Sequence, residues 1–197
     1  MEIFLGTLAS SRPDYLAADL LSQAEHDEQA AAVLLCTSKE LAEKVQREIQ
    51  RQLSVLPRRE IAAQSLKTFG AILLVKSLAE AARITNDLAP EHLELAVADP
   101  FQLLEKIENA GAIFLGHLSP EAIGDYVAGP NHVLPTGTTA RFSSPLGVYD
   151  FIKRSSLICL SPEGLKKLSQ PGICMAEMEN LEGHRQSIQK RRGGEIK

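Results

Sequence analysis

The sequence predicts an α/β fold with a largely parallel sheet. Short apolar runs of strand length, such as residues 31–36 and 71–75, alternate along the chain with stretches whose apolar residues recur at helical spacing. The run at 31–36 is apolar throughout, which is typical of a strand covered by helices on both faces. Strands that alternate with helices form right-handed parallel units, so the pattern indicates an α/β domain.

The expected elements follow one another in order up to residue 115. Strands are expected at residues 3–8, 31–36, 71–75, 93–97 and 111–115. Helices are expected at residues 13–29, 38–56, 58–68 and 77–88, and from residue 99 onward. Pro13 suits a first helical turn, and Ser38 is a good N-cap. Ser77 and Glu80 have the spacing of a capping box.

The chain after residue 145 has a different pattern. A strand is predicted at residues 155–160, a short helix at 162–169 and a longer helix at 173–191, which Gly193 and Gly194 would end. We therefore expect two domains, an α/β domain over residues 1–145 and a small, mostly helical tail over residues 146–197. A tail too small for its own core should lie against something else, such as another subunit.

Composition and charge exclude several classes of protein. The net charge of −4 argues against a nucleic-acid surface, which is normally basic, and the cluster at residues 190–192 is interpreted as a solvated helix end. No apolar run approaches the roughly 20 residues that span a bilayer, and the N-terminus lacks the basic region of a signal peptide. Three cysteines without CxxC spacing indicate a reducing cytoplasm, without disulfides or a cysteine zinc site.

Residues 124–142, GDYVAGPNHVLPTGTTARF, form a segment that is longer and more polar than a plain connection. Most loops in compact domains run about 4–6 residues. Long irregular segments often carry binding or catalytic side chains, but a surface Ω-loop is an equally good interpretation of this composition.

Several polar side chains are candidates for a metal or acid/base site. Gln23 and His26 lie three residues apart near a helix end and can share one face, although a solvated polar face is the simpler interpretation. Glu91 and His92 precede an apolar strand and could do acid/base work. Adjacent strand residues point to opposite faces, so a shared site would need irregular backbone there.

The remaining candidates lie further along the chain. Asp125 and His132 fall in the 124–142 segment, Glu179 and His184 fall in the final helix, and His117 is interpreted as a turn residue. Singly, each suits a structural role. As a set, these His, Asp and Gln donors without thiolates fit a catalytic divalent metal such as zinc. Neither a phosphate-binding glycine motif nor a nucleophile elbow is present.

Six motifs together resemble the histidinol dehydrogenase family. They are SQAEH at 22–26, NDLAPEHLEL at 86–95, NAGAIFLG at 109–116, GDYVAGPNHVLPT at 124–136, ARFSSPLGVYDFIKR at 140–154 and ENLEGH at 179–184. The similarity runs in register from about residue 2 to residue 192, and the motifs around His92 and His132 are highly specific. The resemblance implies a Rossmann-like parallel sheet domain and a cytoplasmic homodimer. It also implies zinc- and NAD-dependent oxidation of L-histidinol, through the aldehyde, to L-histidine in histidine biosynthesis.

The resemblance also implies roles for individual residues. Zinc would be bound by Gln23, His26, Asp125 and, from the partner subunit of a dimer, the residue equivalent to His184. His92 would take the substrate protons, and Glu91 would activate water for attack on the aldehyde. Glu179 would contact the substrate, as would the zinc ligands and the acid/base pair, and His132 would lie near the site.

The chain departs from the family's pattern in extent. It resembles only the C-terminal half, so we expect most of the NAD-binding surface to be missing and Met1 to stand where the family has a substrate-contacting serine. Asn180 stands where the family usually has glycine. Three hypotheses remain: one half of a split enzyme that pairs with a separate N-terminal-half polypeptide, a truncated zinc-binding fragment that is inactive alone, or a non-catalytic scaffold.

Overall fold

A computed structural model describes residues 2–6 and 11–192 of the chain. It contains two compact units, which divide between Phe151 and Ile152. The boundary expected at residue 145 therefore falls within the first unit. Each unit is described by itself.

The first unit is built on a five-stranded sheet with the order β3-β2-β1-β4-β5, in which every pair of neighbouring strands is parallel. The strands are β1 (Glu2–Gly6), β2 (Ala32–Cys36), β3 (Ala71–Leu74), β4 (His92–Ala96) and β5 (Ala112–Leu115). This arrangement confirms the predicted fold class. The predicted end of the first strand, residues 7 and 8, lies outside the described residues.

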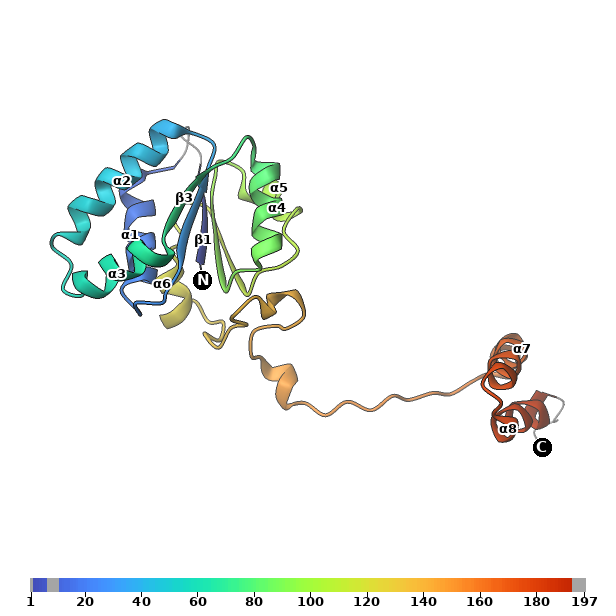
Figure 1. The fold of residues 1–197 in the computed structure, drawn as a ribbon. Coiled ribbons are helices and arrows are strands. Elements are labelled where there is room, and N and C mark those ends of the chain that lie inside the picture. Colours follow the sequence, from blue (N-terminus) through green and yellow to red (C-terminus); the bar gives the residue numbers. More distant parts are fainter. Residues whose placement is uncertain (1, 7–10, 193–197) are drawn as a thin grey trace. The chain divides into compact units, whose positions relative to one another are not determined.

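Helices cover both faces of this sheet (Figure 1). One face carries α1 (Pro13–Ala24), α2 (Lys39–Leu53) and α3 (Arg59–Phe69), and the other carries α4 (Leu78–Leu88) and α5 (Pro100–Leu104). Leu34 on β2 packs with Leu16, Leu20 and Leu41 on the first face, and its neighbour Leu35 packs with Ala81 and Leu93 on the second. Because alternate residues enter different cores, both must be apolar, which explains the unbroken apolar run.

The helix starts predicted in the first unit are confirmed. The Ser38 side chain accepts a hydrogen bond from Leu41 N–H at the start of α2. The Ser77 side chain does the same for Glu80 N–H at the start of α4. In return, the Glu80 carboxylate accepts from the N–H of Lys76 at 2.7 Å, one residue earlier than in the usual capping box.

The second unit consists of two packed helices, α7 (Pro162–Met178) and α8 (Glu182–Arg192). The strand expected at residues 155–160 is wrong, since residues 152–161 form neither helix nor strand. Apolar residues alone do not make a strand, because its backbone needs a neighbouring strand, and none lies in the described part of this unit. The break expected around residues 170–172 is also wrong: Pro171 lies inside α7, at the cost of one helical hydrogen bond.

The true break lies at residues 179–181, between the two helices. Asn180 has a φ of 56° there, a left-handed conformation that glycine and asparagine adopt more readily than other residues. Asparagine is therefore well suited to this position. Gly193 and Gly194, predicted to end the last helix, lie outside the described residues. Among the described residues, no helix has the length and apolar character needed to cross a lipid bilayer.

Candidate active site

His92 is held at the amino end of β4 by a tightly specified turn. The helix α4 ends at Leu88, and Ala89 caps it in the left-handed conformation, with a φ of 46° and its N–H bonded to Thr85 O. Gly111 then donates its N–H to Pro90 O at 2.9 Å, where a Cβ would lie 2.5 Å from Glu91 O. This close approach needs glycine, and it brings the start of β5 beside the start of β4.

A short helix, α6 (Glu121–Tyr126), places two carboxylates near His92. Glu121 and Asp125 are four residues apart, so their side chains lie on one face of the helix. Glu121 is almost fully buried, with 2% of its surface exposed, and Asp125 is half-buried. The segment expected to be irregular from residue 124 therefore begins inside a helix, and that part of the prediction is wrong.

The contact between α6 and β5 depends on Gly124. A Cβ at this position would lie 2.6 Å from Cε1 of Phe114, so only glycine lets the ring pack beneath the helix. The Phe114 ring also contacts the His92 imidazole, with 5.9 Å between ring centroids and a 50° angle between planes. Phe114 thus links the position of α6 to that of His92.

The imidazole of His92 faces both carboxylates. Its Nε2 lies 3.9 Å from Glu121 Oε1 and 3.8 Å from Asp125 Oδ1. One ligand atom from each of the three side chains lies within 4.8 Å of the others, a grouping that could hold a metal ion. Two carboxylates this close in a partly buried site repel each other, so a positive charge between them would be strongly favoured.

The end of α1 joins this cluster through a hydrogen bond. Ser22 Oγ donates to Glu121 Oε2 at 3.4 Å. Gln23, the next residue, is half-buried in the last turn of α1, whereas His26 lies beyond the helix end and is exposed. Two hydrogen bonds hold the backbone of His26 in place. Its N–H donates to Gln23 O, and its carbonyl accepts from the Arg58 side chain.

The predicted site residues therefore fall into four groups. His92 and Asp125 meet directly, and Gln23 and His26 lie at the end of α1, which Ser22 bonds to the same cluster. Glu91 is half-buried immediately before β4. The remaining two, Glu179 after α7 and His184 in α8, are exposed residues of the second unit, so their part in this site stays a prediction.

A pocket of about 470 Å³ opens next to this cluster. His92, Asp125 and His132 contribute polar groups, and the walls come from β5, α6 and residues 128–145. This volume and the mixture of apolar walls with a few polar groups are typical of sites for small molecules. The cluster lies at the amino ends of β4 and β5, whereas ligands of open parallel sheets usually bind outside the carboxyl ends.

Glu121 is the site residue that the sequence analysis missed. Its four-residue spacing to Asp125 was the available signal, but that signal has meaning only on a helix. Gly124, the turn-forming residues after it and the preceding proline made the region resemble a loop.

Comparison with known proteins assigns the family. A sequence model described as histidinol dehydrogenase matches residues 2–192. The chain belongs to the histidinol dehydrogenase family. Among its relatives, the histidinol dehydrogenase of Caldanaerobacter subterraneus subsp. tengcongensis is 56% identical over 92% of this chain and 42% of its own. That of Geobacter sulfurreducens is 54% identical over 95% of this chain and 44% of its own.

The fold agrees with this family. The crystal structure of histidinol dehydrogenase from Elizabethkingia anophelis matches with a TM-score of 0.87 and 34% sequence identity, covering 96% of this chain and 43% of that one. The chain therefore spans less than half the length of the curated relatives it matches. The resemblance read from the sequence motifs is confirmed at the level of the family.

Proposed function

We propose that this chain carries the metal-binding and proton-transfer part of a histidinol dehydrogenase. The reaction is the NAD-linked, two-step oxidation of L-histidinol through histidinal to L-histidine, in histidine biosynthesis. The observation that carries the proposal is the convergence of His92, Glu121 and Asp125 beside a pocket of suitable size, in a chain of this family.

The donor atoms of this region suit zinc. Imidazole nitrogens and carboxylate oxygens are typical ligands of catalytic zinc, and the Gln23 amide oxygen adds a neutral donor. We assign the metal to Asp125, Gln23 and His26, with His184 completing the site from a partner subunit of a homodimer. Bound zinc would act as a Lewis acid that orients the substrate alcohol.

His92 is the proposed proton acceptor from the substrate hydroxyl. It opens onto the pocket, and its Nε2 faces two carboxylates that would stabilise the imidazolium formed when it takes a proton. Glu91, the residue before it, would activate water for attack on the aldehyde. Glu179 would contact the substrate. The hydride acceptor is NAD, and we assign most of its binding surface to the part of the relatives that this chain does not span.

The same proposal covers compartment and assembly. Cys159 and Cys174 are exposed free thiols, and Cys36 is a buried one, which supports a reducing cytoplasm. A polypeptide equivalent to the N-terminal half of the family would have to join the chain for turnover. The alternative is an inactive fragment that binds zinc. The two hypotheses differ in whether turnover appears when the N-terminal-half polypeptide is added.

The decisive assay measures NADH formation with L-histidinol, NAD and stoichiometric zinc. The chain alone should give none. Addition of the N-terminal part of the Caldanaerobacter enzyme, expressed separately and here named the complementary polypeptide, should restore turnover. The His92→Gln variant of this chain, tested in the same mixture, should abolish it. Zinc binding without restored turnover would favour the inactive fragment. Turnover by the chain alone would show that NAD binding does not require the N-terminal-half polypeptide, and would overturn the proposal.

A further inference from the structure

The β3 edge of the sheet differs from the opposite edge in being both apolar and exposed. Leu73 and Leu74 are 41% and 56% exposed, and Phe69, which ends α3 just before the strand, is 45% exposed. By contrast, β5 is half-buried along its length and lines the candidate active-site pocket. Exposed apolar edge strands invite pairing with other polypeptide, so soluble proteins usually protect them.

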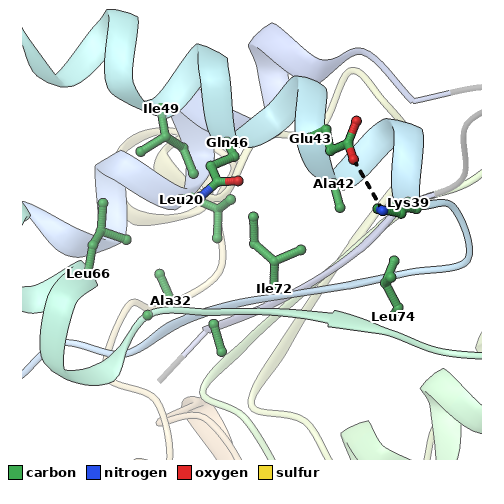
Figure 2. A pocket seen from close by; sticks show the side chains of 12 residues that line it. Leu20, Ala32, Lys39, Ala42, Glu43, Gln46, Ile49, Leu66, Ile72 and Leu74 are labelled. Carbon is green, nitrogen blue, oxygen red and sulfur yellow. Dashed lines mark ion pairs between the residues drawn. The ribbon is translucent and has the colours of Figure 1, made fainter.

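A groove runs along this edge between β3 and the helices α2 and α3. Its volume is about 580 Å³. Figure 2 shows Ile72 and Leu74 pointing from β3 into the groove, opposite Ile49 on α2. The polar groups lie on α2, where Lys39 and Glu43 pair at 3.8 Å, along with Gln46. An apolar floor without converging polar groups suits apolar side chains better than a small polar ligand.

The backbone of β3 is also suited to pairing. Val75 donates its N–H to Cys36 O, and the register with β2 is parallel. Along a strand, alternate residues turn their N–H and C=O groups to opposite sides. Those of residues 71 and 73 therefore face β2, while those of Ile72 and Leu74 face outward at the end of the described sheet.

We infer that the β3 edge and its groove form the docking surface for the remainder of the histidinol dehydrogenase fold, which adds an extended segment beside β3. The chain spans only 42–44% of its relatives, so in them this unit is accompanied by a larger part of the polypeptide. Strand addition satisfies the outward backbone groups, and alternate apolar side chains of the added segment fill the groove. The inference rests on family membership and does not depend on the proposed catalysis.

Amide hydrogen exchange of the wild-type chain, read by NMR with and without the complementary polypeptide, tests the location. The amides of Ile72 and Leu74 should exchange at least about tenfold more slowly in the complex, while those of Leu73 and Val75, which already face β2, should change little. Protection confined to another surface, or no change at any β3 amide in a complex that forms, would overturn the inference.

Substitution provides a second test that needs no enzyme activity. Leu74→Lys should weaken binding of the complementary polypeptide by at least about tenfold in isothermal titration calorimetry. Val55→Lys is the matched control, since Val55 is also an exposed apolar residue of this unit, at 79%, but lies outside the groove. Circular dichroism checks that both variants fold. Equal binding by both variants would contradict the assignment. So would a sedimentation result in which a second copy of this chain occupies the edge while the complementary polypeptide fails to bind.

Discussion

Glu121 on α6 contacts two other elements of the site, with Oε1 3.9 Å from His92 Nε2 at the start of β4 and Oε2 accepting a hydrogen bond from Ser22 on α1. The carboxylate is almost fully buried. It therefore links the element that carries the proposed zinc ligands Gln23 and His26 to the proposed acid/base residue His92. The helix that carries Glu121 also carries Asp125, so one side chain ties together three parts of the site.

Glu121→Gln should weaken zinc binding while leaving the fold intact. Glutamine keeps the shape of the side chain but removes one negative charge from beside Asp125 and His92. Substitutions next to metal ligands typically cost about 10–100-fold in affinity. Titration calorimetry with zinc measures this loss, and Glu60→Gln, an exposed glutamate at the start of α3, is the control that should bind as the wild type does. An unchanged affinity for zinc in the Glu121→Gln variant would show that Glu121 does not contribute to the metal site.

Gly124→Ala should lower stability through Phe114. The added Cβ would lie 2.6 Å from the ring, so the ring must move, at a cost of about 1–3 kcal/mol in the free energy of unfolding. Urea denaturation measures this cost. Gly147→Ala is the control, because its Cβ would meet nothing closer than 3.9 Å. In a Phe114→Leu background, Gly124→Ala should lower the free energy of unfolding by less. If the effects of the two substitutions simply add, residue 124 and the Phe114 ring do not interact.

Cys36 should resist alkylation in the folded chain, whereas Cys159 and Cys174 should react. Cys36 is fully buried on β2, and this burial raises the pKa of its thiol, while the other two are exposed. A raised folded-state pKa means that the thiol stabilises the fold below its unfolded pKa of about 8.5, and that this contribution is lost as the pH rises above that value. Mass spectrometry after iodoacetamide treatment, at rising urea concentrations, should show Cys36 labelled only as the chain unfolds.

Asp125→Asn and His184→Ala should each weaken zinc binding, and mixing the two variants should restore it in part. If His184 completes the site of the partner subunit, a mixed dimer contains one site with both residues intact. Titration of the mixture with zinc should therefore recover high-affinity binding that neither variant shows alone. A mixture that binds no better than its components would place His184 outside the partner's site.

Local signals predicted most of the first unit. The strands at residues 31–36 and 71–75 and the caps Ser38 and Ser77 depend on neighbouring residues, so their patterns remain visible in the sequence. The strand expected at 155–160 failed because strand formation depends on a distant partner. Glu121 was missed because α6 is too short to show helical periodicity, and its contact with Ser22 spans 99 positions in the sequence.

The family motifs predicted which distant residues belong to one site, which local patterns could not do. His92 and Asp125 are 33 positions apart, and no spacing rule relates them, yet the structure brings Nε2 and Oδ1 within 3.8 Å. Glu179 and His184 lie in the second unit, and their proposed part in the site would leave no periodic signal in one chain, because it would depend on a second subunit.

Anomalous diffraction at the zinc absorption edge, from crystals of the zinc-loaded chain, locates the metal. We expect a zinc peak at a coordination distance of about 2.0–2.2 Å from an Asp125 carboxylate oxygen, close to His92 and Glu121. Zinc found only at other residues, with none at Asp125, would show that the metal site is not the one proposed.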